Sequence, residues 1–132
     1  MMEFKKIDAK DLSLNAFKAF ADGWGLVTAG APEKWNTMTI AWGSLGWIWN
    51  RPVCTAYVRL SRYTHEFCED RGTFSVCIFD EGDYRKELGV LGKESGRDID
   101  KMSGCGLTPF ELDGEMVFKE ARTILICKTI FK

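Results

Sequence analysis

The feature that most constrains the fold is a series of short strand-like segments that follow one another without a helix after each one. They are rich in β-branched and aromatic residues, and Gly, Pro, Asn or Asp residues separate them. A parallel sheet would need a long crossover connection after every strand. The series therefore predicts a mainly β fold, an antiparallel barrel. Its segments are Trp24–Ala31, Thr37–Trp42, the first half of Val53–Thr64, Thr73–Phe79, Phe110–Leu112, Met116–Phe118 and Ala121–Phe131.

Short helices are expected between some of these strands. Lys10–Ala21 places Leu12, Leu14, Phe17 and Phe20 among polar residues, which predicts one amphipathic helix. Asp113-Gly114 between two apolar runs predicts a β-hairpin turn. The other expected helical segments are His65–Asp70, Tyr84–Leu91 and Arg97–Met102.

Length and charge limit the classes of function. The 132 residues suit one domain with one core, and 45% of them are hydrophobic. The net charge of −1 provides no field that would hold nucleic acid or an anionic membrane, so neither is an expected partner. No apolar run approaches the roughly 20 residues of a membrane span, and no apolar signal region follows the N-terminus.

The cysteines argue against a metal site. Their number, five, is odd, no pair has Cys-x-x-Cys spacing, and the chain has one His. Free thiols in a reducing cytosol are the expected state, which predicts a cytoplasmic protein. The cysteines are Cys54, Cys68, Cys77, Cys105 and Cys127.

The segment Val53–Thr64 carries the first candidate site. Its first half is apolar and predicts a buried strand, and its second half turns polar and basic at Arg59, Ser61, Arg62 and Thr64. A helix is expected directly after it, and free N–H groups at a helix start favour an anion. One interpretation is a phosphate-binding site. The other is a helix cap at Ser61 or Thr64 with solvated arginines, and the local sequence leaves both open.

The segment Asn36–Trp49 carries the second candidate site. Polar residues alternate with Met38, Ile40 and Trp42, and two glycines and two further tryptophans follow. This pattern suits a planar aromatic ligand held by strand hydroxyls, glycine backbone and indole rings. The alternative is that the tryptophans fill the core or a dimer interface.

Several motifs, in this order, are shared with a known family. They are Asn36–Gly43 (NTMTIAWG), Arg51–Val53 (RPV), Val58–Thr64 (VRLSRYT), Phe74–Val76 (FSV), Ser95–Lys101 (SGRDIDK), Gly106–Pro109 (GLTP), and Glu120-Ala121 followed by Cys127. Together they resemble the flavin reductase-like, FMN-binding split-barrel family, which includes flavoredoxin-type proteins. The resemblance implies an antiparallel split β-barrel with short inserted helices, a homodimer, and FMN bound near the subunit interface. It favours the phosphate interpretation of the Arg59 segment.

The resemblance also implies which residues bind FMN. It places one strand and loop beside the isoalloxazine ring and ribityl chain, a basic turn at the phosphate, and a further loop that reaches the flavin or its phosphate. Hydride chemistry belongs to the flavin, so no catalytic residue and no metal ligand are predicted. The three sets are Asn36, Thr37, Met38, Thr39, Ala41 and Trp42; Arg59, Leu60, Ser61, Arg62 and Thr64; and Ser95, Arg97 and Lys101.

The activity implied is that of an NAD(P)H:flavin oxidoreductase, which passes electrons through FMN to free flavin or a partner. One alternative is a non-catalytic FMN-binding electron-transfer protein with a protein electron donor. Family members usually continue beyond the strand that corresponds to Ala121–Phe131, with an Asp-x-His segment and a further strand. Residues 1–132 are therefore expected to be a single domain without that segment, and a second alternative is a truncated barrel that no longer binds cofactor. A single-stranded nucleic-acid barrel with stacking tryptophans is the remaining alternative, and the pI of about 5.9 argues against it.

Overall fold

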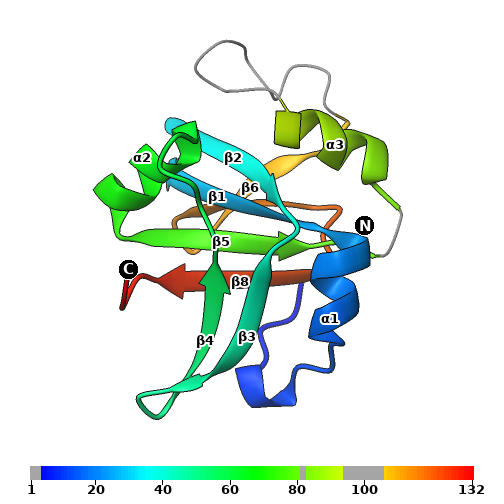
Figure 1. Ribbon diagram of the computed structural model, residues 1–132, viewed down its shortest axis with the longest axis vertical. Helices are drawn as coiled ribbons and strands as arrows, with labels where there is room; N and C mark the ends of the chain where they lie inside the picture. Colours follow the sequence, from blue (N-terminus) through cyan, green and yellow to red (C-terminus); the bar gives the residue numbers. More distant parts are fainter. Residues whose placement is uncertain (1–3, 81–82, 94–105) are drawn as a thin grey trace.

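The structure, a computed structural model, describes residues 4–80, 83–93 and 106–132. Its centre is a four-stranded sheet in the order β2-β1-β5-β8, accompanied by the two-stranded ribbons β3–β4 and β6–β7 (Figure 1). All of the strand pairs among the described residues are antiparallel, which confirms the predicted mainly β, antiparallel class. The strands are β1 Gly25–Ala31, β2 Lys34–Ile40, β3 Gly43–Ile48, β4 Arg51–Ala56, β5 Thr73–Ile78, β6 Pro109–Leu112, β7 Glu115–Phe118 and β8 Thr123–Lys128.

Two longer helices lie close to their predicted positions. Helix α2 spans Tyr63–Arg71 and helix α3 spans Arg85–Lys93. Gly72 ends α2 in the left-handed conformation (φ 72°) that glycine adopts most easily. Within the described ranges, no helix combines the length and the apolar character needed to cross a bilayer. The predicted helical turn Arg97–Met102 lies outside the described residues.

The prediction of one helix over Lys10–Ala21 is wrong. The segment is divided because Asp8 and Asn15 each cap a separate helical start, accepting hydrogen bonds from the backbone N–H groups of Lys10 and Lys18. Only part of the predicted apolar face is buried, since Phe20 is buried whereas Phe17 is 89% exposed. The pieces are a 3₁₀ turn η1 (Ala9–Asp11), a short α1 (Ala16–Lys18) and a π-helical turn η2 (Ala19–Gly23).

Apolar side chains cover both faces of the main sheet. Because successive residues of a strand point to opposite faces, Leu26 and Val27 of β1 belong to different clusters. Leu26 packs with residues from α3 and the β6–β7 ribbon, including Leu88 and Val117. Val27 lies in the second cluster, against which residues of the β3–β4 ribbon such as Leu45 pack. The main sheet is therefore sandwiched between the two ribbons.

The prediction of a buried strand at the start of Val53–Thr64 is wrong. Strand β4 pairs with β3 in a ribbon that crosses the main sheet (Figure 1), and its Arg51, Pro52 and Thr55 are exposed. A two-stranded ribbon can bury one face against the sheet while its other face meets solvent. The hydrophobic and β-branched residues of β4 correctly predicted a strand. They did not predict that one face of this strand is exposed.

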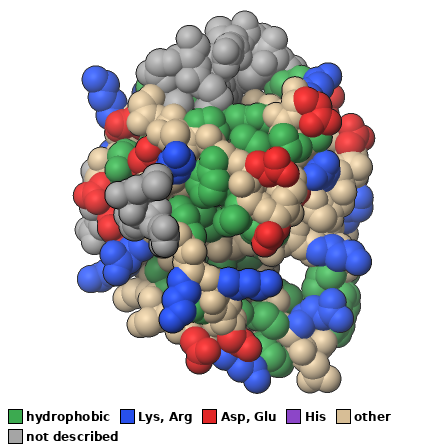
Figure 2. Space-filling view, turned by 180° about the vertical axis from the view of Figure 1, so that it is seen from behind, with side chains coloured by type: hydrophobic (Ala, Val, Ile, Leu, Met, Phe, Trp, Pro, Cys, Tyr) green, Lys and Arg blue, Asp and Glu red, His purple; other side chains and the backbone are tan. Residues whose placement is uncertain are grey.

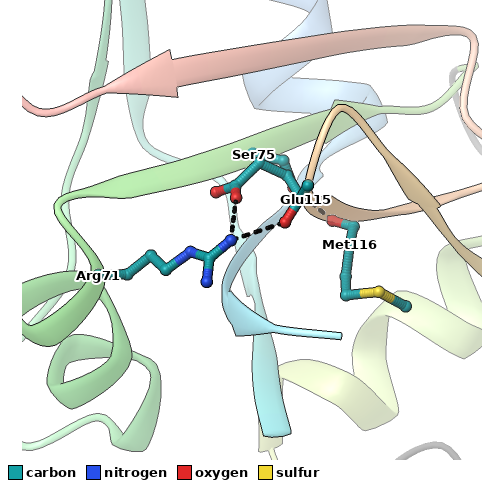
Figure 3. Close-up of polar contacts among 5 residues, drawn as sticks. Arg71, Ser75, Glu115 and Met116 are labelled. Carbon is teal, nitrogen blue, oxygen red and sulfur yellow. Dashed lines mark hydrogen bonds and ion pairs between the residues drawn. The ribbon is translucent and has the colours of Figure 1, made fainter. Parts of the chain in front are cut away.

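The β6–β7 hairpin forms where Asp113-Gly114 predicts it. Both residues have positive φ, 51° and 83°, as a two-residue hairpin turn requires. The hairpin is fixed to α2 by Arg71, whose Nη2 lies 3.1 Å from Glu115 Oε2 and donates to Gly114 O at 2.8 Å (Figure 3). Ser75 of β5 also donates to Met116 O at 2.7 Å. The Arg71 contacts anchor the C-terminal end of α2 to the hairpin, and the Ser75 bond joins the hairpin to the main sheet.

Gly30 of β1 allows helix α2 to approach the sheet closely. It has a φ of 118°, and a Cβ added there would lie 2.6 Å from Trp35 Cα and 2.9 Å from Phe67 Cδ1 of α2. A larger residue would therefore clash with both the neighbouring strand and the helix. This close approach brings the N-terminal end of α2 beside strand β2.

Candidate functional site

Two helices flank β2, which lies at one edge of the main sheet. Thr39 of β2 donates a hydrogen bond to Leu88 O of α3, and a Cβ on Gly92 would lie 3.2 Å from Thr39 Cβ. At the start of α2, Arg62 Nη2 donates to Gly92 O at 3.0 Å. The N-terminal end of α2 and the C-terminal end of α3 are thereby joined across the edge strand.

The chain enters α2 through a turn that leaves the helix start without an accepting side chain at its cap position. Arg62 N donates to Arg59 O at 3.0 Å, and Arg62 is the N-cap residue in an extended conformation (φ −81°, ψ 140°). Because a guanidinium only donates hydrogen bonds, it cannot accept one from the N–H groups of the first turn. The alternative in which Ser61 or Thr64 is the N-cap is therefore wrong.

Asn36 and Thr64 connect the two segments that the sequence singles out. Both side chains are buried, and Asn36 Nδ2 donates to Thr64 Oγ1 at 2.8 Å. Thr64 belongs to the first turn of α2, so the bond fixes the helix start against β2. A buried hydrogen bond between residues far apart in sequence gives the site a defined geometry.

Arg59 and Trp42 lie together at the surface. The guanidinium carbon of Arg59 is 5.6 Å from the centroid of the Trp42 ring, a cation–π arrangement. Trp42 is 64% exposed, which excludes the core-filling interpretation for this residue. Leu60 and Ser61 of the same turn are also exposed. The site therefore has an exposed part, formed by Trp42, Arg59, Leu60 and Ser61.

Other predicted residues of β2 face the interior. The Thr37 hydroxyl donates to Val27 O at 3.1 Å, and Met38 packs in the apolar cluster beneath the β3–β4 ribbon. Ala41 is half-buried just after the strand ends. The side chains of Thr37 and Met38 thus stabilise the strand itself. The predicted Ser95, Arg97 and Lys101 lie outside the described residues.

Gly92 of α3 contributes to the site, although no role was predicted for it from the sequence. Its carbonyl accepts from Arg62, and the lack of a side chain allows α3 to pack against Thr39. A signal was present, because a glycine near the end of a helical pattern is unfavourable unless packing or a cap requires it.

The geometry suits an anion beside a planar group. The N-terminus of α2 carries the positive end of the helix dipole, and the exposed Arg59 and Ser61 provide further donors beside it. Glu66, in the first turn of α2, is a negative charge that would repel a bound anion, and its side chain is exposed to solvent. The exposed indole of Trp42 provides a flat apolar surface next to Arg59.

Comparison with known proteins identifies the fold. No protein-family model and no curated protein sequence matches the chain. Among solved structures, it is similar to an FMN-binding domain of a flavin reductases-like enzyme from Shewanella baltica OS155, with a TM-score of 0.74 and 24% identity. It is also similar to flavoredoxins from Methanosarcina acetivorans (TM-score 0.72, 25% identity) and Desulfovibrio vulgaris Miyazaki F (TM-score 0.73, 23% identity).

The matches extend over nearly all of this chain and part of the other proteins. They cover 90%, 98% and 98% of this chain, and 65%, 66% and 68% of the Shewanella, Methanosarcina and Desulfovibrio chains. The chain thus spans less than two thirds of the length of the first two. Within that extent, its fold is the split barrel of flavin reductase-like FMN-binding domains and flavoredoxins.

Proposed function

We propose that the chain binds FMN at the site beside β2 and passes electrons from NAD(P)H through FMN to free flavin or a protein partner. The observation that carries this proposal is the N-terminal end of α2, held against β2 by the Asn36–Thr64 hydrogen bond with Arg59 beside it. The fold supports the proposal, since the similar proteins from Shewanella, Methanosarcina and Desulfovibrio are named as an FMN-binding domain and as flavoredoxins.

The phosphate of FMN fits the donors at the start of α2. Arg59 and Ser61 are exposed there, and Arg62 uses one N–H for Gly92 O, although a guanidinium has five. Thr64 would contribute its backbone N–H, while its buried hydroxyl positions Asn36. Charge-assisted bonds of this kind are stronger than neutral ones, so the phosphate should supply much of the binding free energy.

The ring of FMN fits the surface at the end of β2. Ala41 is half-buried and Trp42 is exposed there, and Arg59 lies over the indole. When bound, FMN supplies the hydride and electron chemistry, and the protein supplies binding and orientation. Ser95, Arg97 and Lys101 remain part of the proposed site on the strength of the sequence resemblance.

We propose a homodimer as the working form, because large apolar side chains are exposed on and near the β3–β4 ribbon. A contiguous exposed apolar surface usually marks an interaction site. Figure 2 shows hydrophobic side chains interspersed with charged side chains of both signs at the lower end of the molecule, where this ribbon and the N-terminal segment lie. A cytoplasmic location is part of the same proposal, supported by the free thiols. The exposed apolar residues are Trp42, Trp47, Ile48, Trp49, Tyr57 and Leu60.

Steady-state oxidation of NADH and NADPH by the FMN-loaded protein tests the enzymatic part of the proposal. With riboflavin as acceptor, we expect oxidation in proportion to the fraction of protein loaded with FMN. The same assay without added riboflavin measures the background reaction with oxygen. If the loaded protein oxidises neither nucleotide but accepts electrons from a chemical reductant, the electron-transfer alternative with a protein donor replaces the reductase.

A further inference from the structure

The residue that precedes β1 lies at the end of β2, where the ring of FMN is proposed to bind. The antiparallel pairing of β1 and β2 places Gly25 opposite Ile40, the last residue of β2. The residue before this pair, Trp24, therefore lies close to the point where the chain leaves β2 at Ala41 and Trp42.

The helical turn η2 and the start of α3 meet at the same place. The Phe20 ring of η2 leaves no room for a side chain at Gly43, since a Cβ built there would lie 2.5 Å from Phe20 Cε1. Gly43 directly follows Trp42. Arg85, the first residue of α3, donates from Nη2 to the backbone oxygen of Asp22 in η2 at 2.7 Å (Figure 1). Arg85 is thereby held in the region of the proposed ring site.

The guanidinium of Arg85 is stacked on the indole of Trp24. Its Cζ lies 3.8 Å from the ring centroid, well inside the limit of about 6 Å for a cation–π contact. Trp24 is half-buried and has a φ of 62° and a ψ of 171°, a backbone conformation that is unfavourable for any residue with a side chain. Strained residues are concentrated at ligand-binding and active sites, so this position of the indole points to a role in binding.

The Arg85 guanidinium is held in place without being neutralised. Asp22 accepts its hydrogen bond through the backbone oxygen, and among the described residues no carboxylate forms an ion pair with Arg85. The side chain is exposed to solvent, and a guanidinium has five N–H groups, so donors remain for a ligand. Because the stacking already restricts the side chain, less conformational entropy is lost when an anion binds. Arginine also matches the geometry of a phosphate group with two parallel hydrogen bonds.

We propose that Arg85, stacked on Trp24, binds a phosphate group of the nicotinamide nucleotide. This inference rests on the proposed function, which places the ring of FMN at the end of β2 and NAD(P)H as the electron donor. A nucleotide whose nicotinamide reaches that ring has its phosphate groups beside it, and Arg85 is a cation at the α3 side of this position. NADH and NADPH share a diphosphate, and NADPH has an additional 2′-phosphate.

Calorimetric titration of the FMN-loaded protein with NAD+ and NADP+ tests the assignment without electron transfer. Arg85→Ala should weaken binding by about 10- to 100-fold, the range expected for a hydrogen bond to a charged group. Loss of affinity for both nucleotides assigns Arg85 to the diphosphate, and loss for NADP+ alone assigns it to the 2′-phosphate. Arg85→Lys keeps the charge but not the planar fork, so it should retain only part of the affinity.

Lys86→Ala is the matched control. It removes the neighbouring exposed cation of the same helical turn and should bind both nucleotides as the wild type does. FMN affinity should be unchanged in all three variants, which excludes a general disturbance of the site. Three results would overturn the assignment: equal nucleotide binding by Arg85→Ala and the wild type, an equal loss in Lys86→Ala, or a wild-type protein that binds neither nucleotide.

Single-turnover reduction by NADH and NADPH separates this inference from the proposed function. In Arg85→Ala the nucleotide concentration that gives half of the limiting rate should rise, and the limiting rate itself should stay that of the wild type. Nucleotide binding that depends on Arg85, without reduction of FMN, would leave the assignment standing and overturn the reductase. Reduction of FMN with the same half-saturation in Arg85→Ala and the wild type would leave the reductase standing and overturn the assignment.

Discussion

Replacing Arg59 with Ala will weaken FMN binding by about 10- to 100-fold and riboflavin binding far less, since a hydrogen bond to a charged group typically contributes about 1.5–3 kcal/mol. The two ligands differ by the phosphate alone. Arg59 is exposed beside the N-terminal end of α2, where the phosphate is proposed to bind. Fluorescence titration of both flavins against wild type and variant measures the difference.

Two further variants sharpen this experiment. Arg122→Ala removes an exposed arginine next to β8, at the opposite edge of the main sheet from β2, and should bind both flavins as the wild type does. Trp42→Phe keeps an aromatic ring beneath Arg59 but removes the indole, so flavin fluorescence should be quenched less in the complex. If Arg59→Ala weakened the binding of FMN and riboflavin equally, the phosphate of FMN would not be bound by Arg59.

Replacing Arg71 with Ala will lower the free energy of unfolding by about 3–5 kcal/mol, because it leaves a buried carboxylate without its partner. Glu115 is 4% exposed, and its Oε2 lies 3.1 Å from Arg71 Nη2. Among the described residues, its Oε1 has no hydrogen-bond partner, so Arg71 supplies the main compensation for the buried charge. Urea unfolding followed by circular dichroism measures the change.

The matched controls separate the buried charge from the loss of a side chain. Arg122→Ala breaks an exposed ion pair with Asp80 and should cost about 1 kcal/mol or less. The double variant Arg71→Met/Glu115→Met removes both charges and should recover much of the loss. A double variant less stable than Arg71→Ala alone would mean that packing around the hairpin, rather than the unpaired carboxylate, determines the effect.

Elements with a local chemical cause could be predicted from the sequence. Asp113-Gly114 defines a hairpin because both residues tolerate positive φ, and Gly72 ends α2 for the same reason. The Lys10–Ala21 prediction failed because Asp8 and Asn15 cap two separate starts within an otherwise suitable pattern. The burial of β4 could not be predicted, since it depends on how a ribbon crosses a sheet formed by residues far away in the sequence.

In the candidate site too, local sequence predicted some features, while others depend on tertiary packing. The residue types placed Asn36 and Thr64 in two candidate binding segments, but the hydrogen bond between them depends on α2 packing against β2. Local sequence offered Ser61 or Thr64 as the helix cap, whereas the turn from Arg59 places Arg62 there. Glycine at position 92 acquires its role only through the approach of α3 to β2.

Titration of the purified protein with FMN, followed by its visible spectrum and by size-exclusion chromatography, tests the central claim most directly. We expect one FMN per chain, a flavin absorption band that elutes with the protein, and an elution volume of a dimer. Riboflavin at equal concentration should bind more weakly. A colourless protein that elutes without flavin at saturating FMN would contradict the account.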